Sequence, residues 1–519
     1  MKVFGNFGSL LLTFLVAASA QAEGEAANEA GQGILPVPDF SGDLWNRKYL
    51  TGDWAGTRDE LAGKGIQFDA EYYQYVQDVV DGGVASGDQW GGKANYRLHL
   101  DLDRMGVMSG STLYVRFDAR YGDGVLGRTG QLLPANEAFL IPVDFDDLER
   151  ETWGTLTALT LTHFFAPNFA VFGGQIDMMD GDPNEFAGGR GDTQFLNYSM
   201  MYAAPTAIVP ASTLGAGALY MPNEHVTIAT QVVSATDTSF DSFEEGFNRF
   251  DDGQIWATAL MTQYRVRDLP GGFNATYLQW FNAEFTDIGS IAGALESTED
   301  TSWLVALSGW QYLYTEESST GPLDLTNKVP DLQGWGVFAR LGFADKDTNP
   351  FSLTYSIGLG GRGVIPGRDN DLFGLGYFYT ETEDGNVLTS VGIEDDTQGF
   401  EAFYNVAITP AVKLSFDVQW LQATVPDTDD AWQQTFDALP DLVSIHDAEH
   451  RILRVNKAMA DKLGLTPERA AGEFCFVHVH GTDAPPAFCP HCRLLEDGSE
   501  HVTDLESKAR TKSPKAVAV

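Results

Sequence analysis

The chain has 519 residues and a formal net charge of −41 at pH 7, nearly all of which lies before residue 435. Because binding to phosphate needs a basic surface, this charge excludes a nucleic-acid partner for the main body. A mean hydropathy of −0.16 with 12% aromatic residues suits neither a helical membrane protein nor a disordered chain, and 55 glycines and 22 prolines fit many turns between short strands.

The first residues are typical of an export signal. Lys2 supplies a positive charge, Leu10 to Ala18 form a short apolar run, and Ala20-Gln21-Ala22 offers a cleavage site. That run is too short to span a bilayer as a helix, and no other uninterrupted stretch approaches the ~18 apolar residues that a spanning helix needs. We predict a signal peptide over 1–22 and a flexible segment over 23–48, and any membrane-spanning part must be a β-barrel.

Two segments at the start of the main body, 96–103 and 113–121, alternate apolar and charged residues with a period of two. A charge on the lipid face of a barrel would cost roughly 2 to 4 kcal/mol, so the charged faces should line a lumen. The predicted lumen and sugar contacts are Arg97, His99, Asp101, Arg116, Asp118 and Arg120.

A soluble β-sandwich with one wet face would show the same period of two. Two features favour a barrel instead. Aromatic residues such as Tyr121, Trp153 and Trp420 stand at strand ends, as in an interfacial girdle, and tight turns at 166–168 and 409–410 alternate with long acidic connections. The fold class predicted for the main body is therefore all-β, a transmembrane antiparallel β-barrel.

Two sequence blocks carry a family resemblance. The first contains Gly52, Asp53, Trp54, Gly56 and Arg58, and the second contains Pro366, Gly367, Arg368 and Asp371. In this order, over about residues 49–432, they resemble the carbohydrate-selective outer-membrane porins of the OprB family. Ala55 departs from that family, which more often has glycine there.

The resemblance implies a monomeric barrel of about 16 strands in the outer membrane of a Gram-negative bacterium. Such a porin passes carbohydrates, monosaccharides in particular, by passive diffusion into the periplasm, without a cofactor. Its partners would be outer-membrane lipid, carbohydrate solutes and the barrel assembly machinery. The alternatives are a general cation-preferring porin and a hydrolase, but only three histidines precede residue 440 and no nucleophile motif is visible, so an enzyme is not expected.

The first block also predicts local structure. Asp53 can cap a helix from Trp54 to about Ala62, which Gly63 or Gly65 can end. Such a helix is either a scaffold near the periplasmic mouth or a direct solute contact. Gly360, Gly361 and Gly363 predict a bend or bulge in a strand.

The end of the chain has a different character. Residues 442–446 and 451–456 are strand-like, 457–463 are helical, and together with 463–468 they resemble the start of a PAS sensor domain. Later strands of such a domain are not visible after Cys492. We therefore predict a truncated α+β PAS-like segment over 433–506 and a disordered basic end over 507–519.

This tail holds all the cysteines of the chain. Cys489 and Cys492 have CxxC spacing, and Cys475, His478 and His480 lie just before them. Such ligands can hold zinc or another metal, whereas in an oxidising compartment a disulfide or an idle thiol pair is the alternative.

The junction between barrel and tail predicts an open barrel. After the turn at 409–410 a strand runs outward into a polar loop over 422–430, and no closing strand follows Trp432. The last strand is thus missing, and an unpaired edge is costly in lipid. Two hypotheses account for the tail: a frameshift, misassembled gene or fusion that leaves transport to the barrel alone, or a barrel-anchored PAS sensor that needs a complete ligand-binding core.

Overall fold

The structure of the chain is a computed structural model. It describes residues 33–139, 152–180, 182–188, 190, 192–239, 246, 248–289, 298–316, 332–382, 386–390, 393, 396–424, 442–447, 450–486, 489, 492–493, 501–504 and 515–518. The predicted signal peptide lies outside these residues. The chain divides into two compact units, 1–425 and 426–519, which are described separately.

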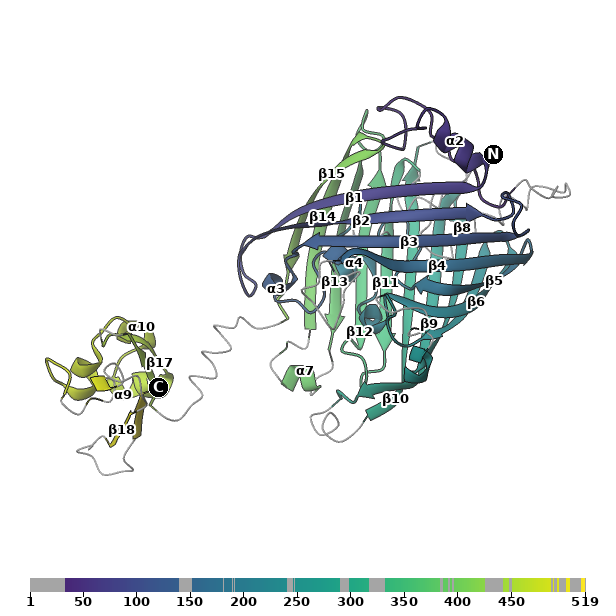
Figure 1. The fold of residues 1–519 in the computed structure, drawn as a ribbon. Helices are drawn as coiled ribbons and strands as arrows, with labels where there is room; N and C mark the ends of the chain where they lie inside the picture. The colour runs from purple at the N-terminus through teal and green to yellow at the C-terminus, as the bar shows by residue number, and fades with distance from the viewer. Residues whose placement is uncertain are drawn as a thin grey trace. The chain divides into compact units, whose positions relative to one another are not determined.

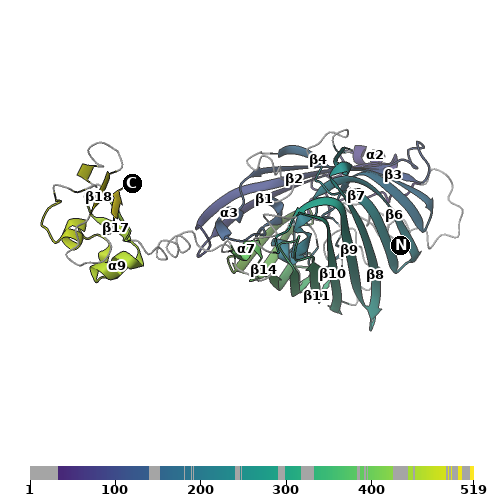
Figure 2. The same cartoon turned by 90° about the horizontal axis from the view of Figure 1, so that it is seen from below.

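The described residues of the first unit contain one antiparallel sheet of fifteen strands in sequence order (Figure 1). The strands are β1 (Ile66–Val79), β2 (Gly87–Asp101), β3 (Ser111–Gly122), β4 (Thr152–Ala166), β5 (Phe169–Asp177), β6 (Ser212–Asn223), β7 (Val226–Ser234), β8 (Gln254–Val266), β9 (Leu269–Thr286), β10 (Thr298–Thr315), β11 (Gly334–Ala344), β12 (Leu353–Arg362), β13 (Leu372–Glu381), β14 (Asp396–Thr409) and β15 (Val412–Leu421). In Figure 1 the front strands β1 to β4 cross the rear strands β11 to β14, and Figure 2 shows the curvature of the same sheet from below. The predicted barrel is confirmed.

The period of two sorts the side chains of each strand between the two faces of the sheet. On β11, Trp335, Leu341 and Phe343 are 38%, 41% and 39% exposed, whereas Phe338 and Arg340 on the opposite face are 2% and 3% exposed. Strand side chains alternate between faces, so the exposed apolar row points outward and the buried row, which contains Arg340, points inward. An apolar outer surface with a charged interior is typical of a barrel in lipid.

The connections differ in length between the two ends of the barrel. Four tight turns, 167–168, 224–225, 267–268 and 410–411, share one end. The long connections 123–151, 178–211, 235–253, 287–297 and 382–395 share the other end. Both tight turns predicted from the sequence are confirmed, and the connection 316–333 is a long exception at the short-turn end.

Within the described residues, the sheet has two unpaired edges. β1 pairs with β2 and β15 pairs with β14, and no pairing joins β1 to β15. Fifteen strands agree with the expectation of about sixteen from which the last is missing.

The segment before β1, which the sequence predicted to be flexible, makes contacts with the barrel. The backbone N–H groups of Ile34 and Leu35 donate to Asp101 at 2.7 and 2.8 Å, and Phe40 is 2% exposed. Ile34, Leu35 and Phe40 of the segment predicted to be flexible are therefore engaged by the rest of the protein. These contacts fix the segment against the start of the barrel.

The short helix α2 (Thr57–Gly63) follows this segment and begins later than predicted. Its N-cap is Gly56, with φ 90°, and not Asp53. The Asp53 carboxylate instead accepts the Ala55 N–H at 3.1 Å and closes the preceding turn. Trp54 and Ala55 both have left-handed φ values, which explains why the helix cannot start at Trp54.

The described parts of two long connections, 123–139 and 178–211, fold into the barrel. They carry the short helices α3 (Leu126–Thr129), η1 (Glu137–Phe139), α4 (Tyr198–Met201) and η2 (Ala204–Ile208). Elsewhere in the first unit are η3 (Arg249–Asp252) and α7 (Val387–Ser390). Aromatic and methionine side chains of 178–211 pack in one buried cluster with Trp310, Phe338 and Phe403 of the wall. Segment 178–211 is therefore a packed inner loop, and we call it the inner loop.

Glycines on the inner wall make room for the inner loop. A Cβ at Gly336 would lie 2.6 Å from the Phe186 ring, and one at Gly360 would lie 3.0 Å from the Phe186 Cβ. A Cβ at Gly374 would lie 2.8 Å from the Phe195 ring. The sequence predicted a bend at Gly360, and the structure instead shows that the inner loop closely approaches the barrel wall at this residue.

The second unit contains β16 (Ser444–His446), β17 (Ile452–Val455), α9 (Lys457–Leu463), α10 (Pro467–Ala470), the π-helix η5 (Phe476–His480), β18 (His501–Asp504) and β19 (Lys515–Ala518). The predicted helix 457–463 is confirmed, and the Asn456 side chain caps it by accepting the Met459 N–H at 3.0 Å. β18 pairs with β19, which lies inside the segment 507–519 where the sequence predicted no structure.

No helix among the described residues is long and apolar enough to cross a membrane.

Candidate functional site

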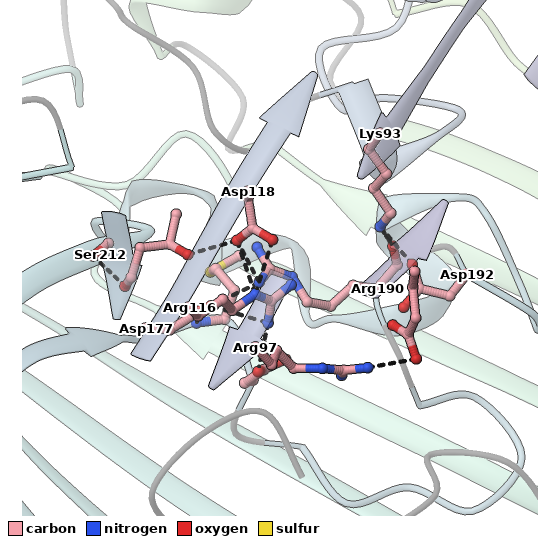
Figure 3. Close-up of polar contacts among 12 residues, drawn as sticks. Lys93, Arg97, Arg116, Asp118, Asp177, Arg190, Asp192 and Ser212 are labelled. Carbon is pink, nitrogen blue, oxygen red and sulfur yellow. Dashed lines mark hydrogen bonds and ion pairs between the residues drawn. The ribbon is translucent and has the colours of Figure 1, made fainter. Parts of the chain in front are cut away.

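A network of buried ion pairs lies on the inner face of β3 (Figure 3). The Arg116 guanidinium contacts Asp118 at 2.8 Å, Asp180 at 2.8 Å and Asp177 at 3.3 Å. Asp118 also accepts the Thr157 hydroxyl at 2.6 Å. Desolvated charges of this kind are stable only with partners, so Arg116 fixes the start of the inner loop, where Asp180 lies, to β3.

The inner loop supplies a second cation to this network. Arg190 Nη1 lies 2.6 Å from Asp177 Oδ2, and Arg190 Nε lies 3.7 Å from the Glu137 carboxylate. Lys93 of β2 contacts Asp192 at 2.5 Å and also donates to the Arg190 carbonyl. Burial raises the pKa of Glu137 even though Lys93 and Arg190 lie beside it.

The opposite wall of the barrel also holds the inner loop. Arg340 of β11 contacts Asp182 at 2.6 Å and donates to the Ala187 and Met200 carbonyls at 2.6 and 2.5 Å. On β14, Glu401 accepts the backbone N–H groups of Leu196 and Asn197. The inner loop is therefore tied across the barrel from β3 to β14.

A cavity of about 130 Å³ lies between the inner loop and the barrel wall. Roughly 10 to 15 Å³ of cavity volume is enough to hold one water molecule, so this cavity has room for several. Its polar lining comes from both the loop and the wall: Asp182, Tyr202, Gln231, Asn274, Ser308 and Arg340. Groups that can bond hydroxyls thus surround a space that also touches an aromatic ring.

The six predicted lumen residues all lie on the inner face, but they have different surroundings. Arg116 and Asp118 belong to the network described above. Arg97 pairs with Glu71, and Arg120 donates to the Phe139 carbonyl. These two charges are therefore engaged by the protein itself.

His99 and Asp101 lie nearer the short-turn end of β2. The His99 ring packs 4.7 Å from that of Tyr114, and its Nε2 has no hydrogen-bond partner among the described residues. Asp101 is 0% exposed and anchors the segment before β1. Asp101 is thus placed as an anchor and not as a solute contact.

Arg58 of the first family block is enclosed by aromatic rings. Its guanidinium carbon lies 4.1 Å from the Phe40 ring centre and 4.4 Å from that of Tyr49. It also donates to Asp69 at 2.7 Å and to the Phe68 carbonyl at 2.8 Å. Ring faces attract a guanidinium, so this block joins the preceding segment to β1 and serves as a scaffold.

The second family block forms the connection between β12 and β13. Arg368 makes a bidentate pair with Asp371 at 2.7 and 2.8 Å. Asp371 further accepts the Tyr404 hydroxyl at 2.7 Å and the Ala407 N–H at 2.9 Å. Burial opposes ionisation of Asp371, but these hydrogen bonds outweigh it and lower the pKa of the carboxyl. The turn, which starts at Gly363 and contains Pro366 and Gly367, is thereby fixed to β14.

The tail residues predicted to bind metal are only partly brought together. Cys489 and Cys492 lie close to His450, which the sequence did not suggest as a ligand. His478 instead contacts Glu473 at 3.2 Å, and the side chain of His480 lies outside the described residues. Burial, together with the neighbouring Cys489, raises the pKa of the Cys475 thiol to about 11.

Several residues of the site were not predicted from the sequence. Lys93 continues the inward row of β2 and could have been found by the same alternation. Arg340 stands on an alternating strand beside the second block. Arg190 and Asp192 lie in the inner loop, where no periodicity marks a residue as inward.

Comparisons with known proteins agree with this architecture. The family model described as carbohydrate-selective porin, OprB family, matches residues 88–428, and a PAS fold model matches residues 436–519. No curated protein matches the chain.

The chain is also similar to solved structures, and the first of them has the same fold. The high-pH structure of Pseudomonas putida OprB is 17% identical, covers 75% of this chain and 96% of its own, and has a TM-score of 0.62. The low-pH structure of that protein is 14% identical, covers 73% and 95%, and has a TM-score of 0.47.

Proposed function

Because the chain belongs to the carbohydrate-selective porin family, the OprB family, we propose that its barrel lets carbohydrates diffuse passively and selectively into the periplasm, with monosaccharides as the solutes. The barrel lies in the outer membrane of a Gram-negative bacterium, and its family and fold are those of a channel.

The cavity beside the inner loop is the observation that best supports this proposal. A sugar needs partners for its hydroxyls and an apolar surface for its ring face. Gln231, Asn274 and Ser308 offer amides and a hydroxyl, and Tyr202 offers the ring. A pore must also release its solute, which suits a few polar contacts better than a deep binding pocket.

The proposal is tested by ion current through single barrels in a planar bilayer, with glucose added in steps. We expect glucose to reduce the current in a saturable way. Gln231→Ala removes an amide from the cavity and should weaken this block several-fold. Gln279→Ala is the matched control. Gln279 lies between the inward-facing Leu278 and Trp280 on β9, so its side chain points to the outer face of the strand.

If glucose reduces the current to the same extent in both variants, the sugar passes through another part of the barrel. No block in the wild-type channel would contradict sugar selectivity altogether.

One observation favours a second candidate, a general cation-preferring porin. In the network on β3, the cations Lys93, Arg116 and Arg190 meet the carboxylates of Asp118, Glu137, Asp177, Asp180 and Asp192. The excess of carboxylates attracts cations. An unblocked, cation-selective current in the same bilayer experiment would support this function.

A further inference from the structure

The second unit brings three potential metal ligands together from distant parts of its sequence. His450 Nε2 and Cys492 Sγ are 3.8 Å apart. One ligand atom from each of His450, Cys489 and Cys492 lies within 4.8 Å of the other two. Cys489 is 5% exposed, and no disulfide joins the cysteines. This group is called the tail cluster below.

Backbone contacts hold the tail cluster in place. The Cys475 N–H donates to the His450 carbonyl at 2.9 Å, and Arg451 forms a β-bridge with Phe474. His450 has a φ of 67°, a conformation that non-glycine residues adopt only when their surroundings enforce it. The imidazole is thereby aimed from the start of β17 toward the cysteines.

The CxxC segment completes the arrangement. The Cys489 N–H donates to the Pro486 carbonyl at 2.9 Å, and the Arg493 N–H reaches the Cys489 carbonyl at 3.4 Å. This helical turn places Cys492 on the same side as Cys489. The Cys475 thiol is not one of the three grouped ligand atoms, but the bond of its N–H to the His450 carbonyl and its electrostatic contact with Cys489 and Cys492 place it nearby.

We propose that His450, Cys489 and Cys492 bind a Zn²⁺ ion, with Cys475 as the fourth ligand. Zinc prefers thiolate and imidazole ligands in a tetrahedron, with bonds of about 2.3 Å to sulfur and about 2.0 Å to nitrogen. These bond lengths separate a sulfur and a nitrogen ligand by about 3.6 Å. The observed 3.8 Å between Cys492 and His450 is close to this separation.

On binding, each thiol loses its proton to solvent and its sulfur forms a bond to the ion, while His450 donates the lone pair of its neutral ring. No electron is transferred. The ligand set differs from the one predicted from the sequence, because His450 takes the place of His478 and His480. A residue far from the CxxC pair in sequence could be identified only from the fold.

The test uses the full chain, purified in detergent and loaded with Zn²⁺. We expect one zinc per chain by elemental analysis, and, with Co²⁺ in its place, the visible absorption of tetrahedral thiolate coordination. His450→Gln and Cys492→Ser should each lower zinc affinity by about a hundredfold or more, beyond the ~10 to 100-fold that outer partners of a metal site contribute. Cys475→Ser should also lower it.

His478→Gln is the matched control, since His478 pairs with Glu473 outside the tail cluster. It should bind zinc as the wild type does. Circular dichroism and channel conductance of each variant verify that the chain has folded, and the cobalt spectrum of the wild type does not depend on any variant.

Three results would overturn the proposal. They are an absence of stoichiometric zinc, a loss of zinc in His478→Gln but not in His450→Gln, and a Cys489–Cys492 disulfide found by mass spectrometry in a chain that does not take up zinc. Unchanged affinity in Cys475→Ser would overturn the assignment of the fourth ligand.

Discussion

At the scale of single residues, the two family blocks are explained by contacts within the protein. Arg58 lies between aromatic rings and donates to Asp69, while Asp371 accepts from Arg368, Tyr404 and the Ala407 N–H. Of the two roles considered for the first block, scaffold and direct solute contact, its geometry favours the scaffold. Both blocks secure connections at the short-turn end of the barrel.

Asp371 makes barrel stability dependent on pH. Its folded pKa is lowered, so its contribution is fully present above the unfolded pKa and is lost as pH falls through the folded pKa. Asp371→Asn should cost about 2 kcal/mol at neutral pH. The difference in free energy of unfolding between the wild type and Asp371→Asn should become smaller at acidic pH.

Urea unfolding of the refolded barrel at several pH values measures the effect. Asp369→Asn is the control, because Asp369 is exposed, and it should change little. A deficit for Asp371→Asn that is independent of pH would contradict the role of its charge.

Ala55 offers a test of local strain. It has a φ of 57°, and a side chain in this region costs roughly 1 to 2 kcal/mol relative to glycine. Ala55→Gly should therefore raise the free energy of unfolding by up to about 1 kcal/mol, after the greater freedom of glycine in the unfolded chain is subtracted. Ala70→Gly on β1 should instead lower it, and the same sign for both changes would argue against strain at Ala55.

At the scale of elements, strands were predictable and the inner loop was not. The alternation around Arg97 and Arg116 is set by strand geometry alone, so the inward faces of β2 and β3 follow from the sequence. Segment 178–211 has no such period, and its position depends on contacts with Arg340 and Glu401 more than a hundred residues later. His450 was not predicted for the same reason, because only the fold brings it close to cysteines that are distant in sequence.

We expect the inner loop to narrow the channel. Arg340 of β11 holds this loop through its side-chain contacts. Arg340→Gln removes the pair with Asp182 and the bonds to two loop carbonyls. Single-channel conductance should rise and glucose block should weaken. Arg362→Gln is the control, because Arg362, the last residue of β12, donates to Asp369 and Asn370 in the turn that follows. A conductance equal to that of the wild type in Arg340→Gln would show that the loop does not limit flow.

At the scale of the whole molecule, the chain contains a porin barrel, with fifteen strands among the residues that the structure describes, and a PAS-like unit. Among the described residues, the unpaired edges at β1 and β15 agree with the missing last strand that the sequence predicted. The barrel interior carries the evidence for transport, and the tail cluster carries a separate chemistry. The two activities can therefore be tested independently in one protein.

Solute uptake by proteoliposomes tests the transport account most directly. Liposomes that contain the purified chain are placed in glucose or in lysine, a cationic solute of similar size, and their swelling rates are compared. The account predicts that glucose enters faster than lysine and far faster than into liposomes without protein. Faster entry of lysine, with glucose no faster than into empty liposomes, would contradict it.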